Sequence, residues 1–210
     1  VLGDQAFVIQ RLAHQRDDGV VDLFRGDIGA RLDGLLQDVR KLIEFGKGGT
    51  ALNLFLHDLP RLSVDIDVVF VPWQAPRADA LAAIAKGLDT IAAKLEQRGW
   101  GARPVAGNEG ESKLLVEDPG HQVKIEVNTV FRGTVLPVES RPLVPAAADF
   151  ATEFSLPILA PDELYGGKLV AALDRQHPRD LFDVHVMFES GGLGDGAIEC
   201  FVTYLAGHNR

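Results

Sequence analysis

Apolar positions recur every three or four residues in two long stretches of the chain. Residues 28–45 and residues 79–97 each carry an apolar stripe at this spacing. The pattern predicts two amphipathic helices. Gly46 and Gly99 follow these stretches and are predicted to end the helices.

Apolar segments of a different kind are predicted to be β-strands. The first is residues 62–71, which lie between two prolines and are rich in Val, Ile and Phe. Residues 112–118 and 122–131 are predicted to form a hairpin, because Pro119–Gly120 between them is typical of a turn. Residues 133–157 are rich in proline and are predicted to be irregular.

The C-terminal third of the chain is predicted to be helical. Pro161 and Pro178 suit first helical positions, and each is followed by an acidic residue within the first turn. A short helix is predicted to start near Thr50. The predicted order is helices, one strand, a helix, a hairpin and a helical C-terminal part. This order indicates an α+β fold with a small mixed or antiparallel sheet.

Composition argues against some classes of protein and indicates a cellular location. The chain has 210 residues, a formal net charge of −9 at pH 7 and a pI near 5.1, which argues against broad electrostatic binding to nucleic acid. Cys200 is the single cysteine, so no internal disulfide is possible, and a cytoplasmic location is expected. No apolar run approaches the ~20 residues that span a membrane. Trp73 and Trp100 are expected to pack in the interior.

Two acidic residues interrupt the first predicted strand. Asp65 and Asp67 are two residues apart, so their side chains are expected on the same face of the strand. Two carboxylates at this spacing repel each other unless a cation lies between them, and Mg²⁺ prefers carboxylate and phosphate oxygens. The alternative is an ordinary solvated strand face, which is the commoner meaning of an isolated D-x-D.

A third carboxylate lies on the second strand of the predicted hairpin. Lys124 and Glu126 share one face of that strand. If the strand lies beside the one that carries D-x-D, Glu126 joins the same group and could bind a metal or take a proton from an attacking hydroxyl. The alternative is an exposed cross-strand charge pair.

A glycine pair precedes the D-x-D strand. Gly48 and Gly49 allow close approach of a ligand to the backbone, and Thr50 follows them at the predicted start of a helix, where amides bind phosphate. The alternative is that these residues only cap two helices.

These motifs together resemble the polymerase-β-like nucleotidyltransferase superfamily. Within it, the chain resembles the AbiEii/AbiGii branch, the toxins of type IV toxin–antitoxin and abortive-infection systems. The resemblance rests on GGTAL at 48–52, RLSVDID at 61–67, KIE at 124–126 and DELYGGKLVAALDRQHPRDLFDV at 162–184. It extends over about residues 40–190.

The resemblance implies a fold and a division of the chain. The family fold is a small mixed sheet flanked by helices, with a C-terminal helical subdomain. Residues 1–135 are expected to form the nucleotidyltransferase core with N-terminal helices. Residues 136–210 are expected to form a linker and the helical subdomain that completes the site. The chain is shorter than the branch leads us to expect.

The resemblance also implies roles for named residues. Asp65, Asp67 and Glu126 are expected to be catalytic and to bind Mg²⁺ or Mn²⁺. Lys168 and Asp180 are the other expected catalytic residues, and Arg61 is a helper at the edge of the site. The nucleotide is expected to contact five residues, which are Gly48, Gly49, Thr50, Ser63 and Lys168.

The implied reaction transfers a nucleoside monophosphate from a nucleoside triphosphate (NTP) to an acceptor hydroxyl, with release of pyrophosphate. The acceptor implied is an RNA, with a tRNA 3′ end as the best candidate, and the implied protein partner is a cognate antitoxin. No membrane partner is expected. One alternative is an inactive module on the same fold that binds a nucleotide or a protein. The other is a D-x-D glycosyltransferase, which does not need the glycine turn.

Overall fold

A mixed five-stranded sheet forms the centre of the structure, a computed structural model that describes residues 44–61, 63, 65–106, 111–118, 121–145 and 155–208. The strand order is β1-β2-β5-β4-β3. Strands β2 and β5 are parallel, and the other neighbouring pairs are antiparallel. The strands are β1 (Glu44–Lys47), β2 (Asp65–Val69), β3 (Gly101–Ala106), β4 (Glu111–Asp118) and β5 (His121–Asn128).

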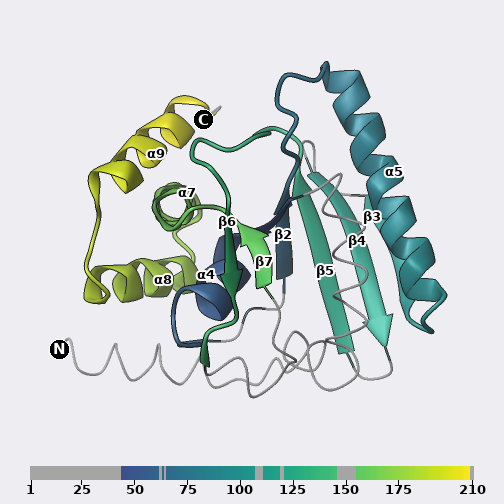
Figure 1. The fold of residues 1–210 in the computed structure, drawn as a ribbon, viewed down its shortest axis with the longest axis horizontal. Coiled ribbons are helices and arrows are strands. Elements are labelled where there is room, and N and C mark those ends of the chain that lie inside the picture. Colours follow the sequence, from purple (N-terminus) through teal and green to yellow (C-terminus); the bar gives the residue numbers. More distant parts are fainter. Residues whose placement is uncertain are drawn as a thin grey trace.

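One face of this sheet is apolar, because side chains alternate along each strand. Val68, Val127 and Leu114, from β2, β5 and β4, share this face and are almost fully buried. Helix α5 (Arg77–Glu96) packs against β3 and β4 (Figure 1). The apolar stripe of α5 is buried at the predicted spacing, at Ile84, Leu88, Ile91 and Leu95.

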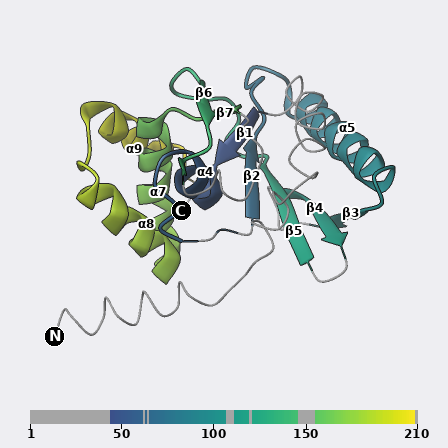
Figure 2. The ribbon, with the colours of Figure 1, turned by 60° about the horizontal axis from the view of Figure 1, so that its bottom comes forward.

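The remaining helices lie at the other end of the sheet. Helix α4 (Gly48–Phe55) follows β1 directly and packs against β1, β2, α7 and α8. Helix α7 (Pro161–Arg175) contacts both α8 (Pro178–Glu189) and α9 (Asp195–Ala206). Figures 1 and 2 both show this C-terminal group of helices far from α5, with the sheet between them.

Part of the proline-rich segment is regular. Strands β6 (Glu139–Pro142) and β7 (Ser155–Ile158) form a two-stranded antiparallel sheet, and β7 contacts β1. The prediction of irregular structure over residues 133–157 is therefore wrong at these two strands. Pro142 and Pro157 concealed them, but proline is compatible with strands at a sheet edge.

Three predicted helices are confirmed: the one over 79–97, the one that begins at Pro161 and the one that begins at Pro178. The predicted hairpin is also confirmed, as β4 and β5. The predicted helix over 28–45 lies outside the described residues except at its end, where the prediction is wrong because β1 begins at Glu44. Gly46 does not end a helix. It lies inside β1 with φ of +93°, at a shift of register, and a Cβ atom there would clash with Ile158.

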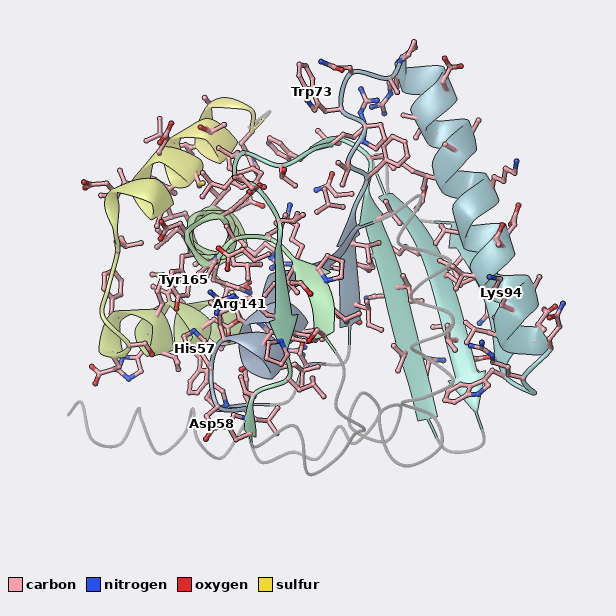
Figure 3. All side chains as sticks on the ribbon, viewed as in Figure 1. His57, Asp58, Trp73, Lys94, Arg141 and Tyr165 are labelled. Carbon is pink, nitrogen blue, oxygen red and sulfur yellow. The ribbon has the colours of Figure 1, made fainter. Side chains whose placement is uncertain are left out.

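The two tryptophans differ in burial. Trp100 packs partly buried against the hydrophobic core, as expected. Trp73 is 62% exposed and lies on the loop before α5 (Figure 3), so the expectation that it packs inside is wrong. Its amide donates to the carbonyl of Val71 (2.6 Å), so Trp73 lies in a tight turn and not in a helix or strand that packs on the core.

Across the described part of the chain, no helix is long and apolar enough to cross a membrane. The division of the chain after residue 135 stays a prediction. The α+β class and the small mixed sheet agree with the expectation.

Candidate active site

A cavity of about 480 Å³ lies between the polar face of the sheet and the C-terminal helices. It receives side chains from β1, β2, β5, α7, α8 and α9. Of the ten residues that the sequence singled out for the site, nine line it: Gly48, Gly49, Arg61, Ser63, Asp65, Asp67, Glu126, Lys168 and Asp180.

The parallel pairing of β2 and β5 brings the three carboxylates together. Asp67 lies opposite Glu126, and Asp65 lies opposite Lys124. All four side chains therefore point to the polar face, away from α5. The D-x-D strand and the K-I-E strand are therefore neighbours, which is the condition on which a role of Glu126 in the site depends.

Asp67 is buried beside two other carboxylates. Burial, followed by the negative charges of Glu126 and Asp65, raises its pKa to about 6. The ammonium groups of Lys47 and Lys168 act in the opposite direction without cancelling this effect. A cation placed beside Asp67 would favour its ionised form.

Glu126 is held by two lysines. Its carboxylate lies 3.1 Å from Nζ of Lys113 and 3.0 Å from Nζ of Lys124, and Lys124 also lies 3.4 Å from Asp65. Burial acts to raise the pKa of Glu126, but the hydrogen bonds and charges of both lysines outweigh it and hold that pKa below its usual value. The cross-strand charge pair considered as the alternative is therefore present.

The residues that could hold a metal ion are Asp65 and Asp67, with Glu126 beside them. Within the described ranges, no three His, Cys, Asp or Glu side chains are already arranged around a single point as metal ligands. Two carboxylates fit Mg²⁺, because Mg²⁺ commonly takes one or two carboxylates and completes its shell with water and substrate phosphates.

The glycine pair is required by what lies against it. Gly48 has φ of +76°, and a Cβ atom on it would clash with Oδ2 of Asp67. A Cβ atom on Gly49 would lie 2.5 Å from Nη2 of Arg61 and 3.2 Å from Oγ of Ser63. The first two residues of α4 can therefore lie this close to Asp67, Arg61 and Ser63 only because they have no side chains.

Thr50 is the predicted site residue that does not line the cavity. Its hydroxyl donates to the carbonyl oxygen of Asp65, which ties α4 to the start of β2. Asn53, one turn later, donates to the carbonyl of Gly49 (2.6 Å). These two bonds fix the glycine turn on the strand that carries the carboxylates.

Lys168 lies at the centre of a buried ion network on the helical side of the cavity. Its ammonium is 3.0 Å from Oδ1 of Asp180 and 2.9 Å from Oδ2 of Asp183. Arg61 binds Asp183 through two nitrogens, at 2.6 and 2.5 Å. Arg175 binds Asp180 at 3.0 Å. The network joins the loop before β2 to α7 and α8.

Two residues of this site were missed by the sequence analysis as site residues. Asp183 is 3% exposed, and its only signal in the sequence is its spacing of three from Asp180. Lys47 lines the cavity beside Gly48 and lies opposite Asp67 in the register of β1 and β2. The sequence analysis did not place Lys47 on a strand, because it predicted a helix that ends at Gly46.

Comparisons with known proteins identify the fold and the family. The chain is similar in structure to MenT4, a nucleotidyltransferase toxin from Mycobacterium tuberculosis H37Rv, with a TM-score of 0.61 and 20% sequence identity. The match covers 95% of this chain and 70% of MenT4, and it shows a shared fold. No curated protein matches the sequence.

A family model settles the membership. The model of the AbiEii nucleotidyl transferase toxin, type IV toxin–antitoxin system, matches residues 47–210. That range contains the glycine pair, the carboxylates of β2 and β5 and the ion network of α7 and α8. The chain belongs to the AbiEii family of nucleotidyltransferase toxins of type IV toxin–antitoxin systems.

Proposed function

We propose that this nucleotidyltransferase transfers a nucleoside monophosphate from an NTP to a hydroxyl group at the 3′ end of an RNA, with tRNA as the best candidate, and releases pyrophosphate. The observation that carries the proposal is the position of Asp65, Asp67 and Glu126 on one wall of a cavity, directly beside a glycine turn. Transfer of a nucleotide needs carboxylates that hold a divalent metal ion. It also needs groups beside them, such as backbone amides, that bind the phosphates.

Asp65 and Asp67 would hold Mg²⁺ or Mn²⁺ together with oxygens of the nucleotide. The fit is supported by the crowding of negative charge at Asp67, whose pKa of about 6 reflects burial and two neighbouring carboxylates. When bound, such an ion polarises the phosphate under attack and lowers the pKa of the attacking hydroxyl.

The residues around this pair have separate tasks. The amides of Gly48 and Gly49, at the N-terminus of α4, bind phosphate oxygens, and Ser63 donates at the edge of the site. Thr50 contributes through its position in the first turn, because its hydroxyl is bonded to Asp65. Glu126 is the third carboxylate, and it takes up metal or the acceptor proton in exchange for its lysine partners.

On the helical side, Lys168 and Asp180 shape the acceptor end of the cavity. Lys168 is compensated by Asp180 and Asp183, so it stabilises the wall as well as adding positive potential near Asp67. Arg175 and Arg179 lie on the exposed rim. A rim with few cations on an acidic protein suits the end of an RNA better than a long duplex.

The partner that the family implies is a cognate antitoxin. We propose that it counteracts the transferase activity. Co-expression with each gene that lies beside this one tests the proposal, because the antitoxin should relieve the toxicity.

The experiment that tests the proposal is label transfer to host RNA. The purified protein is incubated with Mg²⁺, total RNA and each of the four NTPs labelled at the α-phosphate, beside the Asp65→Ala/Asp67→Ala variant. We expect label in an RNA band with the wild type and none with the variant. Label in a protein band would overturn the RNA acceptor, and no label with any NTP would overturn the transferase activity.

A further inference from the structure

We propose that Lys47 is the residue that binds the phosphate groups of the nucleotide and of the pyrophosphate product. This inference rests on the proposed function and adds a substrate-binding residue to the same site. Lys47 lies at the end of β1, immediately before the glycine pair, and it lines the cavity. It is paired in register with Asp67 on the neighbouring strand β2.

The ammonium of Lys47 is held by aromatic faces. Its Nζ lies 5.1 Å from the ring centre of Tyr204 and 5.9 Å from that of Phe131, distances at which a cation is attracted to a ring face. The two rings pack edge to face with their centres 5.4 Å apart. Among the described residues, no carboxylate forms a salt bridge with Lys47.

This aromatic support is itself fixed by a buried carboxylate. The hydroxyl of Tyr204 donates to Glu163 at 2.6 Å, and Glu163 is fully buried. Glu163 also accepts from the amides of Val135 and Leu136, both at 2.9 Å. Helix α9, helix α7 and the segment after β5 are thereby joined behind Lys47.

The two lysines of the cavity differ in how their charge is balanced. Lys168 makes short ion pairs with both Asp180 and Asp183, so its charge is already compensated. Burial lowers the pKa of Lys47, and the negative charges of Asp67 and Glu163 act in the opposite direction. Glu163 has its hydrogen bonds satisfied, and Asp67 is the residue that would bind metal. Of the two lysines that line the cavity, Lys47 is therefore the one without a short ion pair to a described carboxylate, and it can bind an anion.

Phosphate is the anion that the surroundings favour. Lys47 is next in sequence to the amides of Gly48 and Gly49, at the N-terminus of α4, where anions are favoured. An ammonium beside such amides is a common arrangement for holding a phosphate chain. A nucleoside without phosphates would not use it.

The test is calorimetric binding with Mg²⁺ present. The probes are the α,β-methylene analogues of the four NTPs, inorganic pyrophosphate and the free nucleosides. We expect Lys47→Met to weaken binding of the analogue and of pyrophosphate about 10- to 100-fold and to leave nucleoside binding unchanged. Lys86→Met, on the exposed face of α5, is the matched control and should change neither.

The possible failures are separable. If the wild type binds one analogue and Lys47→Met binds it equally well, the assignment of Lys47 is overturned while the proposed function stands. If the wild type binds none of the analogues, the proposed function fails, and this inference fails with it.

A second measurement needs no variant. Wild-type protein is treated with an amine-reactive acetylating reagent, and modification of Lys47 and Lys86 is followed by mass spectrometry. Analogue and pyrophosphate should protect Lys47 several-fold, nucleoside should not, and Lys86 should react equally in all samples. Modification of Lys47 at the same rate with and without a bound analogue would overturn the assignment.

Discussion

Gly48 packs directly against the carboxylate of Asp67, so that any side chain on this glycine would collide with Oδ2. The contact joins the first turn of α4 to strand β2, which carries the Asp65 and Asp67 carboxylates. Position 48 requires glycine for two reasons. A Cβ atom would clash with Asp67, and the φ of +76° favours a residue without Cβ.

The first prediction concerns this contact. Gly48→Ala should lower the rate of nucleotide transfer at least about 100-fold, a loss expected when a reacting group is misplaced by about 1 Å. Gly99→Ala is the matched control, because Gly99 has a similar φ of +87° but nothing within 4 Å of its would-be Cβ. Both variants carry backbone strain, and only the first displaces Asp67. Equal transfer rates for the two variants would contradict the account.

The strands at the site were predictable from local patterns. The alternation in β2 and in β5 identified which side chains share a face, and the parallel pairing then placed Asp67 beside Glu126. Strand β3 was not predicted, because Pro104 interrupts it, and its position at the sheet edge is what makes the proline tolerable. Strand β1 has four residues and a shift of register, which leaves no pattern to recognise.

Contacts between residues far apart in the chain could not be predicted from the sequence. Asp180 and Asp183 could be placed on one side of a helix from their spacing. The partner of Asp183, however, is Arg61, which is 122 residues away. Lys47 likewise depends on Tyr204 of the last helix, and no local periodicity reports such a pair.

The second prediction is a pH dependence at Asp183. Burial acts to raise its pKa, but the hydrogen bonds and charge of Arg61 and the charge of Lys168 outweigh it, so the pKa lies below the ordinary 3.8. A carboxyl with a lower pKa in the folded state adds stability above about pH 4 and loses it as the pH falls through the folded pKa.

Asp183→Asn should therefore lower the free energy of unfolding by about 3 kcal/mol or more at pH 7, because two buried cations lose a partner. The difference from wild type should shrink below pH 4. Denaturant unfolding at several pH values measures it, with the exposed Asp89→Asn as control. A difference that is small at pH 7, or that grows on acidification, would count against the network.

The third prediction separates the two interpretations of Glu126. As third carboxylate of the site, Glu126→Gln should reduce transfer about 100-fold or more. Its side chain is 21% exposed and its ion pairs lie near solvent, so the stability should change by no more than about 1 kcal/mol. Glu117→Gln, on the same face of the sheet, serves as control. Unchanged transfer in Glu126→Gln would leave it as a cross-strand charge pair only.

The fourth prediction concerns metal binding. At a Mg²⁺ concentration about ten times its dissociation constant, the wild type should gain about 1.4 kcal/mol, or a rise of roughly 3–6 °C in unfolding temperature. Asp65→Asn/Asp67→Asn should show no rise with Mg²⁺. In EDTA this variant should be at least as stable as wild type, because it removes carboxylates that repel each other. An equal Mg²⁺ response in both proteins would place the metal elsewhere.

The most direct test of the central claim follows the two ends of the same nucleotide. Once label transfer has identified the NTP and the acceptor, parallel reactions use that NTP labelled at the α- or at the γ-phosphate. The account predicts the α-label in the acceptor RNA and the γ-label in free pyrophosphate, and neither product with Asp65→Ala/Asp67→Ala. Appearance of the γ-label in the acceptor would show phosphoryl transfer instead, and equal products from the variant would show that β2 does not carry the reaction.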